Sequence, residues 1–425
     1  MQASNSGQKA TPEQTSNTAT SPVNIAPIIT CPGCDALQVL PFIRSGSLRC
    51  WRCKGTLERA TGRSLDAALA CGLTTLFLLF PANLLTLLSV SYAGIVSETH
   101  AGSGVFTLWS EGWALVAVVV GLQVVLLPFF RFGLLTLSLG AIHSGSTGKW
   151  IGPAFRWAEK LDPWAMPDVF LIGCAIGYSR INPYAPVSVG PGGWCMVGAA
   201  LMAMMTRASL DRRSIWRCIR APEVSLSEQP HISCTACNLL IPESAEGQRC
   251  PRCYQRVWKR KPFAWTRAAA LTLAGFVLYP VANVYPMSMF SSHFIHTTHT
   301  IFTGVTDLID AHLWPLAVLV FVASIGIPFM KLAGMAWFLW SIRYGSDKKL
   351  LFKTELYRVI DELGRWSNMD VYTIAVFTPM VQFGQLARFE AGKGTPAFLA
   401  VVVFTMMASE LFDPRLIWDA AGVNR

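Results

Sequence analysis

Residues 127–133 read LPFFRFG and residues 326–334 read GIPFMKLAG, so a proline, a phenylalanine and a basic residue recur 200 positions apart. The basic residues, Arg131 and Lys331, lie inside long apolar runs. A charge in such a run is costly unless the side chain reaches water or belongs to a polar site. The two stretches therefore indicate a duplicated membrane module with a polar position inside each copy.

The composition around these stretches is that of a membrane protein. The chain has 425 residues, of which 52% are apolar and 14% charged, and its mean hydropathy is +0.41. Soluble domains carry about 25% charged residues, and a membrane helix needs about 20 apolar residues. The sequence predicts an all-α polytopic membrane protein. The eight expected spans are Leu65–Ser91, Trp113–Leu139, Asp168–Ile181, Trp194–Thr206, Ala264–Phe290, Leu313–Ser341, Val371–Arg388 and Pro396–Phe412.

Lysine and arginine are distributed unevenly among the predicted loops. The segment between the fourth and fifth spans is rich in both, whereas Tyr92–Gly112 and Ser291–His312 contain neither. The positive-inside rule therefore predicts that both termini and the central segment are cytoplasmic. A nucleic-acid partner is the alternative explanation of the basic segment. Because membrane topology already accounts for the charge, we expect no such partner.

Eight of the twelve cysteines form two clusters of paired C-x-x-C motifs. Two such motifs separated by a dozen or so residues place four thiolates around one tetrahedral ion, and zinc suits a closed all-sulfur site. Iron and a redox-active dithiol are the alternatives. We expect two structural Zn²⁺ ions, one in each small cytoplasmic ribbon. The predicted ligands are Cys31, Cys34, Cys50 and Cys53 in the first cluster and Cys234, Cys237, Cys250 and Cys253 in the second.

Other motifs recur in the same order after each cysteine cluster. Trp164-x-x-x-Asp168 matches Trp366-x-x-x-Asp370, and the Met-Met pair at 204–205 matches the pair at 406–407. Because each copy holds four spans, an even number, the sequence predicts two tandem four-helix transmembrane modules in parallel topology, each preceded by a zinc ribbon. The expected boundaries are 1–25 for a disordered tail, 26–62 for the first ribbon, 63–215 for the first module, 228–260 for the second ribbon and 262–418 for the second module.

This order of motifs resembles the paraquat-inducible protein A family. The resemblance rests on the paired C-x-x-C ribbons, Ile327–Lys331, the Trp-x-x-x-Asp-Val elements and the C-terminal FDPRLIWD at Phe412–Asp419. It implies a bacterial inner-membrane protein that moves lipids between the inner and outer membranes, with membrane phospholipids as substrate. It also implies a periplasmic partner built of MCE domains. One departure is that Met166 of the first Trp-x-Met-x-Asp motif is replaced by Asn368 in the second copy.

The predicted topology brings Lys331 and Asp370 to a similar depth. They lie on consecutive antiparallel spans in the cytoplasmic half of the membrane, and Thr405 of the last span can add a hydroxyl to the same site. We predict a transport or lipid-headgroup site here, with Arg131 and Asp168 as counterparts in the first module. The alternative is that Lys331 extends to the headgroups while Asp370 caps its helix.

Prolines interrupt the first span of each module. Pro81 precedes Asn83, and Pro280 precedes Asn283. A proline frees a backbone carbonyl and bends the helix, and a nearby asparagine can hydrogen-bond to the freed backbone. Broken helices border the substrate path of many transporters, so these four residues are included in the candidate transport site. A packing kink is the alternative interpretation.

Histidines 293, 296 and 299 form a spaced trio in a predicted periplasmic segment. A metal site is one interpretation, and a solvated loop or a partner contact is the other, favoured one.

Three functional classes fit the sequence. The first is lipid transfer with a periplasmic partner, the second is a membrane oxidoreductase that uses the cysteines, and the third is a channel or a zinc-stabilised scaffold. The chain has no P-loop: the string GSTGK at 145–149 lacks the required spacing, which argues against ATP hydrolysis and, with the rest, against an enzyme.

Overall fold

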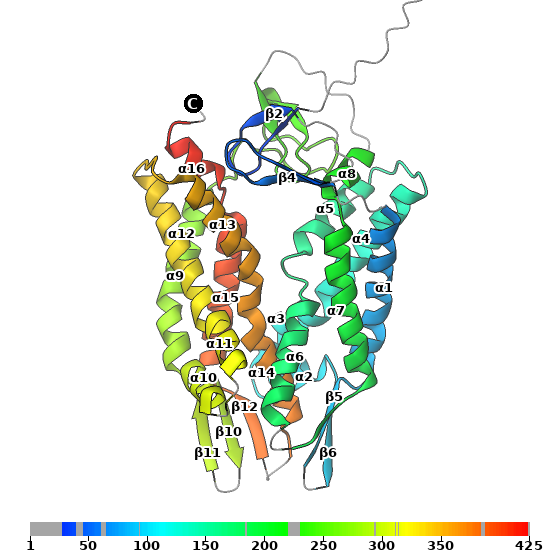
Figure 1. The fold of residues 1–425 in the computed structure, drawn as a ribbon, viewed down its shortest axis with the longest axis vertical. Coiled ribbons are helices and arrows are strands. Elements are labelled where there is room, and N and C mark those ends of the chain that lie inside the picture. Colours follow the sequence, from blue (N-terminus) through cyan, green and yellow to red (C-terminus); the bar gives the residue numbers. More distant parts are fainter. Residues whose placement is uncertain are drawn as a thin grey trace, which may run out of the picture.

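The computed structural model of the chain describes residues 28–39, 46–60, 65–92, 94–182, 185–219, 230–292, 295–310, 312, 314–383 and 387–423. The tail expected over residues 1–25 lies outside these ranges. The molecule is elongated, with the two cysteine ribbons at one end, β-hairpins at the other and long helices between them (Figure 1).

The two halves of the chain repeat one order of elements. The first half contains α1 (Leu65–Leu84), β5 (Leu88–Tyr92), β6 (Ile95–Thr99), α2 (Ser103–Ser110), α3 (Ala114–Gly121), α4 (Leu127–His143), α5 (Ile151–Leu161), α6 (Pro167–Ile181), β7 (Val187–Val189), α7 (Pro191–Ser209) and α8 (Arg212–Cys218). The second half contains α9 (Ala264–Val284), β10 (Ser288–Ser292), β11 (Ile295–His299), α10 (Ile301–Asp310), α11 (Trp314–Phe321), α12 (Ile327–Arg343), α13 (Leu350–Leu363), α14 (Met369–Met380), β12 (Ala387–Ala391), α15 (Gly394–Leu411) and α16 (Arg415–Ala420).

Among the described residues, five helical segments are long and apolar enough to cross a membrane. They are Leu65–Leu84, Ala114–His143, Ala264–Val284, Trp314–Arg343 and Gly394–Leu411. The other three expected spans correspond to α6, α7 and α14. At 1.5 Å per residue α6 and α14 are about 22 and about 18 Å long, short of the roughly 30 Å hydrocarbon core.

Three of the expected spans are longer than the helices that the structure contains. The segments Leu65–Ser91, Ala264–Phe290 and Val371–Arg388 each begin as a helix and end in a β-strand, namely β5, β10 and β12. In β5 the side chains of Leu88 and Val90 are buried, and those of Ser89 and Ser91 are less so. This period of two is that of a strand rather than a helix. β5 pairs with β6 and β7, and β10 pairs with β11 and β12, in two matching antiparallel sheets.

A π-helical turn interrupts the long second span of each half. The turns cover Leu122–Leu126 and Val322–Gly326 and are followed within two residues by Pro128 and Pro328. A proline cannot donate the hydrogen bond that an α-helix requires at its position, and a wider turn adjusts the backbone around it.

The short helix α14 lies at the centre of the molecule and joins the two halves (Figure 1). All of its residues except Asp370 are buried, and it packs against α6 and α2 of the first half. Glycines permit these contacts: a Cβ at Gly104 would lie 1.9 Å from the Ala375 carbonyl oxygen, and one at Gly173 would lie 3.1 Å from the Tyr372 Cβ. Larger residues at these positions would push the halves apart.

The cysteine ribbons are built from β-hairpins and tight cysteine turns. The first holds β1 (Ile28–Thr30) paired with β2 (Leu37–Val39) and β3 (Gly46–Arg49) paired with β4 (Thr56–Ala60); the second holds β8 (His231–Ser233) paired with β9 (Leu240–Pro242). In each C-x-x-C turn the next residue has a left-handed φ, from 54° to 61°, and donates its N–H to the carbonyl of the first cysteine. These four residues are Asp35, Lys54, Asn238 and Tyr254.

The separation of the ribbons from the hairpins gives a topological prediction. A cysteine can be introduced at His100, next to β6, and labelled with an impermeant maleimide added to intact inner-membrane vesicles of known orientation. It should react only in vesicles whose periplasmic face is on the outside. The native Cys218, which is exposed beside the ribbons, should react only from the opposite face and provides an internal control. Reaction of both positions from one face would contradict the arrangement.

Candidate metal centres and buried polar clusters

Each cysteine cluster brings four sulfur atoms together. Within each, all four Sγ atoms lie within 4.8 Å of one another and all four side chains are buried. In the first, Cys31 lies 3.5 Å from Cys53 and Cys34 lies 3.6 Å from Cys50; in the second, the corresponding distances are both 3.6 Å, for Cys234–Cys253 and Cys237–Cys250.

These distances fit a tetrahedral metal site. A disulfide requires sulfurs about 2.05 Å apart, so the cysteines are free thiols. Four thiolates at the usual zinc–sulfur distance of about 2.3 Å lie about 3.8 Å from one another, close to the spacing found here. The two clusters, Cys31–Cys34–Cys50–Cys53 and Cys234–Cys237–Cys250–Cys253, can therefore each hold one metal ion, as predicted.

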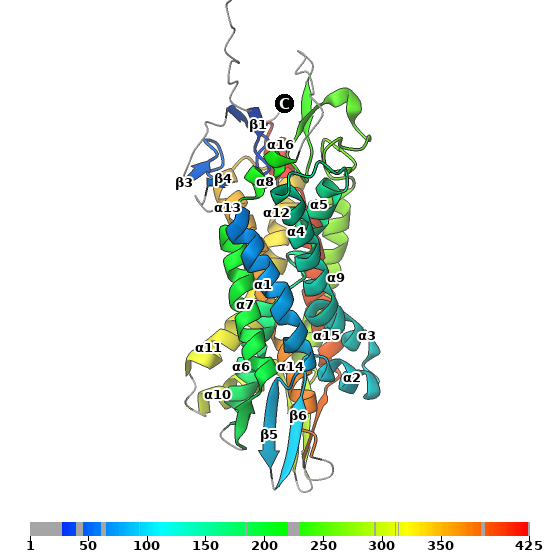
Figure 2. The ribbon, with the colours of Figure 1, turned by 90° about the vertical axis from the view of Figure 1, so that its right-hand side faces the viewer.

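The first ribbon docks on the second half of the chain. Arg358 of α13 donates one hydrogen bond to the Cys53 carbonyl, at 3.1 Å, and another to the Cys53 Sγ, at 2.9 Å. Arg260 forms an ion pair with Asp35 at 2.8 Å, and the first ribbon's cysteines pack in one cluster with Phe338 and Trp418. β3 and β4 lie beside α13 (Figure 2).

The second ribbon docks on the first half in the matching way. Arg156 of α5 occupies the position that Arg358 occupies in α13, and it donates to the Cys253 carbonyl at 2.9 Å. Gly152 lets the ribbon approach, because a Cβ there would lie 2.1 Å from the Arg252 carbonyl oxygen. Each ribbon therefore contacts the module that does not follow it directly in the sequence, and the first ribbon is also tied to its own half by the ion pair of Glu58 with Arg217 at 2.7 Å. Sequence reasoning did not anticipate this crossing.

In the first half, four charged residues form a closed network around Arg131. Arg131 pairs with Asp162, and Arg207 bridges Asp162 at 3.0 Å and Asp168 at 2.7 Å. Arg212 adds a contact to Asp162 at 3.5 Å. Arg131 and Asp168 are thus in one cluster, as expected, but they are joined through Asp162 and Arg207, which the sequence analysis did not single out.

In the second half, the residues that match Asp162 and Arg207 are Gly364 and Ser409. Lys331 is fully buried, and its Nζ donates to the Gly364 carbonyl at 3.3 Å. A Cβ at residue 364 would lie 2.8 Å from the lysine Nζ, so a larger residue there would force the end of the lysine side chain to move. Asp370 begins α14. Its pairing with Lys331 stays a prediction.

A further polar cluster links the halves beside this site. Asn368 donates to the Gln123 side-chain oxygen at 2.6 Å, and the Tyr372 hydroxyl donates to the same atom at 3.2 Å. All three side chains are buried, and Gln123 lies in the first π-turn. Asn368 stands where the first copy has Met166, which is buried in the hydrophobic core. The replacement of Met166 by Asn368 was therefore the feature of the sequence that pointed to this polar cluster.

The other predicted site residues bond within their own helices. The Thr405 hydroxyl, buried in α15, donates to the Val402 carbonyl at 2.9 Å. Pro81 and Pro280 lie inside α1 and α9, and Asn83 and Asn283 each donate to the carbonyl four residues earlier, at 2.8 Å. These are packing contacts of the two helices, and a transport role for the five residues stays a prediction.

The histidine trio falls partly outside the described residues, because His293 is not among them. His299 forms an ion pair with Asp307 at 2.9 Å. Among the residues that the structure describes, the two cysteine clusters are the groups placed to hold a metal.

The metal sites lead to a stoichiometric prediction. The purified chain should contain two ions, one for each tetrad, and elemental analysis should identify them as zinc, because four thiolates close the coordination shell. Replacing Cys250 and Cys253 with serine should remove one ion and lower the abundance of the protein, since metal binding supplies folding free energy. Stoichiometric iron, or less than one ion per chain, would contradict this.

The crossed docking leads to a second prediction. Arg358→Ala should weaken metal retention by the first ribbon about tenfold or more, because a hydrogen bond to a ligand sulfur orients and stabilises the thiolate. Release of metal to a chelator measures this. Arg156→Ala is the matched control, since Arg156 reaches a carbonyl and no sulfur, and it should change retention less. Equal effects of the two variants would refute the assignment.

Comparisons with known proteins agree with this architecture. The family model of paraquat-inducible protein A matches residues 65–220 and again 265–422, one match for each half. The chain is 30% identical to the intermembrane transport protein PqiA of Escherichia coli strain K12, over 92% of this chain and 95% of that protein. It is 28% identical to lipophilic envelope-spanning tunnel protein A of the same strain, over 92% and 91%, and 24% identical to a probable intermembrane transport protein of Haemophilus influenzae, over 92% and 95%. No solved structure matches. The chain is a multi-pass membrane protein that belongs to the paraquat-inducible protein A family.

Proposed function

We propose that this protein moves phospholipids between the inner and outer membranes of a bacterial envelope. It would sit in the inner membrane and load lipid into, or unload it from, a periplasmic tunnel built of MCE domains. The names of its relatives support the proposal, since they describe intermembrane transport and an envelope-spanning tunnel. The same names favour a transporter over an enzyme.

The proposed topology has two tandem four-helix modules in parallel, with both termini and both zinc ribbons in the cytoplasm. The repeated element order supports it, as does the common position of the two β-sheets at the end opposite the ribbons (Figure 1). The short helices α6 and α14 would complete the crossing together with the segments that flank them. Their central position shields them from lipid.

The contrast between the two halves is the observation that carries the proposed site. In the first half Arg131 is neutralised by Asp162, whereas the same place in the second half holds Gly364. Arg207 is likewise replaced by Ser409 at the matching position of the second half. A buried charge requires a counter-charge or a dense set of hydrogen bonds. Asp361 of α13 provides part of the counter-charge of Lys331. We infer that a lipid headgroup provides the rest, with Asp370 and Thr405 in the same site.

The alternative of an oxidoreductase has less support. All eight clustered cysteines are buried in the two tetrads, and the described part of the chain places no other pair of cysteines in contact. A redox role would require thiols that can reach a partner.

The site is tested by the double variant Lys331→Met with Asp370→Leu. Removing both charges restores apolar packing and avoids an uncompensated buried charge, so the variant should reach normal abundance. It should fail to move fluorescent phospholipid from inner-membrane vesicles to acceptor vesicles in the presence of the periplasmic partner. Normal abundance with full lipid transfer would overturn the proposed site.

Asp162→Leu in the first half is the matched control. It leaves Arg131 buried without its carboxylate, which should lower the free energy of unfolding by roughly 3–5 kcal/mol. Adding Arg131→Met should recover much of this loss while lipid transfer per folded molecule stays close to that of the parent. If the first-half variants abolished transfer at normal abundance, the division of roles between the halves would be wrong.

A further inference from the structure

A pocket of about 260 Å³ lies between α9 and α12 at the end of the molecule that bears the ribbons. It is open on one side. Its lining residues are Trp265, Ala336, Leu339, Trp340, Arg343 and Tyr344. Arg343 follows Lys331 by twelve residues, about 18 Å along the helix, so the pocket is separate from the site proposed above.

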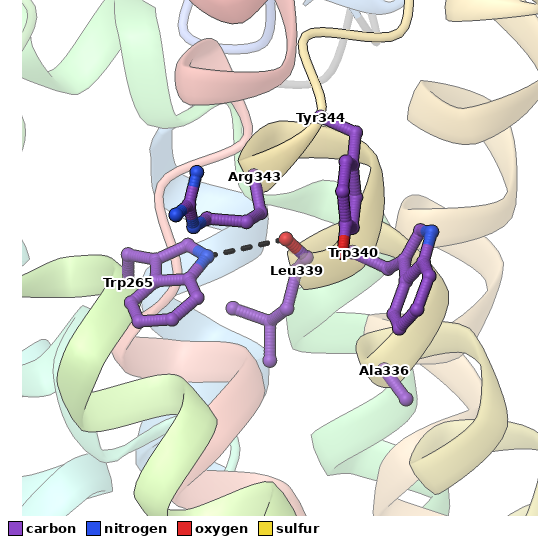
Figure 3. Close-up of a pocket in the computed structure, with 6 residues that line it drawn as sticks. All are labelled: Trp265, Ala336, Leu339, Trp340, Arg343 and Tyr344. Carbon is purple, nitrogen blue, oxygen red and sulfur yellow. Dashed lines mark hydrogen bonds between the residues drawn. The ribbon is translucent and has the colours of Figure 1, made fainter.

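Contacts within the protein hold the aromatic walls of the pocket in place. The Trp265 indole N–H donates to the Leu339 carbonyl at 3.2 Å, which fixes this ring as one wall. The rings of Trp340 and Tyr344 pack together with centroids 4.8 Å apart and form the other wall. Figure 3 shows Arg343 next to Trp265, with Leu339 between the two walls.

The guanidinium group of Arg343 is available to a ligand. Within the described part of the chain, no carboxylate lies within 4.0 Å of it, and the side chain is exposed. A cation between aromatic rings, above the apolar side chains Leu339 and Ala336, matches a phosphate with attached hydrocarbon. Arginine binds phosphate oxygens through paired hydrogen bonds, and the helix ends place it at headgroup level.

The first half provides an internal comparison. The pair that matches Arg343 and Thr266 is His143 and Asp66, whose side chains form an ion pair at 2.9 Å. The aromatic walls are also missing there, since Leu65, Gly140 and Ser144 stand in place of Trp265, Trp340 and Tyr344. Aromatic and basic residues are generally enriched at the membrane interface. If that preference alone explained Trp265, Trp340 and Arg343, similar residues would be expected at the matching positions of the first half. The pocket is therefore a special feature of the second half.

We propose that this pocket binds one anionic phospholipid from the surrounding leaflet. Its phosphodiester would be held by Arg343, its headgroup would lie against Trp340 and Tyr344, and an acyl chain would follow Leu339 and Ala336 down the groove. The inference depends on the chain being embedded in a membrane and is independent of lipid transport, because the pocket faces outward and is distant from Lys331.

The experiment is native mass spectrometry of the full-length purified protein, titrated with phosphatidylglycerol or with neutral phosphatidylcholine. The parent should retain one phosphatidylglycerol in preference to phosphatidylcholine. Arg343→Gln should weaken that binding by about fivefold or more, the effect of losing one cation at a membrane surface. Trp340→Leu should weaken it as well, and Lys149→Gln, which removes an exposed charge in the matching loop of the first half, should not.

A second variant recreates the first half in the second. Thr266→Asp adds a carboxylate where Asp66 stands and should occupy Arg343, so that phosphatidylglycerol retention falls as in Arg343→Gln while every wall of the pocket remains. Unchanged thermal stability in phosphatidylcholine would confirm that both variants are folded. Equal retention of the two lipids by the parent, or full phosphatidylglycerol retention by Arg343→Gln, would overturn the proposal.

Discussion

The hydrogen bonds from Arg358 and Arg156 to the opposite ribbons hold the two halves of this protein in register. A ribbon of about thirty residues has too small a core to be stable alone and depends on its metal and its neighbours. Because each arginine belongs to the half that is distant in sequence, each ribbon depends for this docking contact on the module that does not follow it directly. At the centre of the molecule α14, packed against α2 and α6, completes the connection.

On this common scaffold the two halves differ in electrostatics rather than in backbone. The first half keeps a cluster in which Arg131, Arg207 and Arg212 form ion pairs with Asp162 and Asp168. The second half has Lys331 and Asp370 at the positions of Arg131 and Asp168. Gly364 and Ser409 stand in place of Asp162 and Arg207. Gly364 has neither the negative charge nor the side-chain volume of Asp162, the residue at the matching position of the first half. Lys331 instead donates to the Gly364 backbone carbonyl, and Asp361 of α13 is the carboxylate that interacts with it electrostatically.

Much of this arrangement could be predicted from short motifs. The spacing of eight cysteines predicted two tetrads, and the recurrence of Pro-Phe-x-basic predicted the duplication and the buried position of Lys331. The strands β5, β10 and β12 were missed because their apolar residues continue the hydropathy of the preceding spans. The network partners Asp162 and Arg207 were missed because tertiary contacts define them. Local sequence carries no sign that Arg207, four helical turns into α7, reaches a loop before α6.

The two π-turns record an order of events. A π-turn is one residue wider than an α-turn and is rare in helices. Both halves carry it at the same place, Leu122–Leu126 and Val322–Gly326, so the π-turn was present in the single ancestral module before it was copied. The differences between the halves at positions 162 and 364, 166 and 368, and 143 and 343 arose after the copying. The π-turns are therefore older than the differences in charge between the two halves.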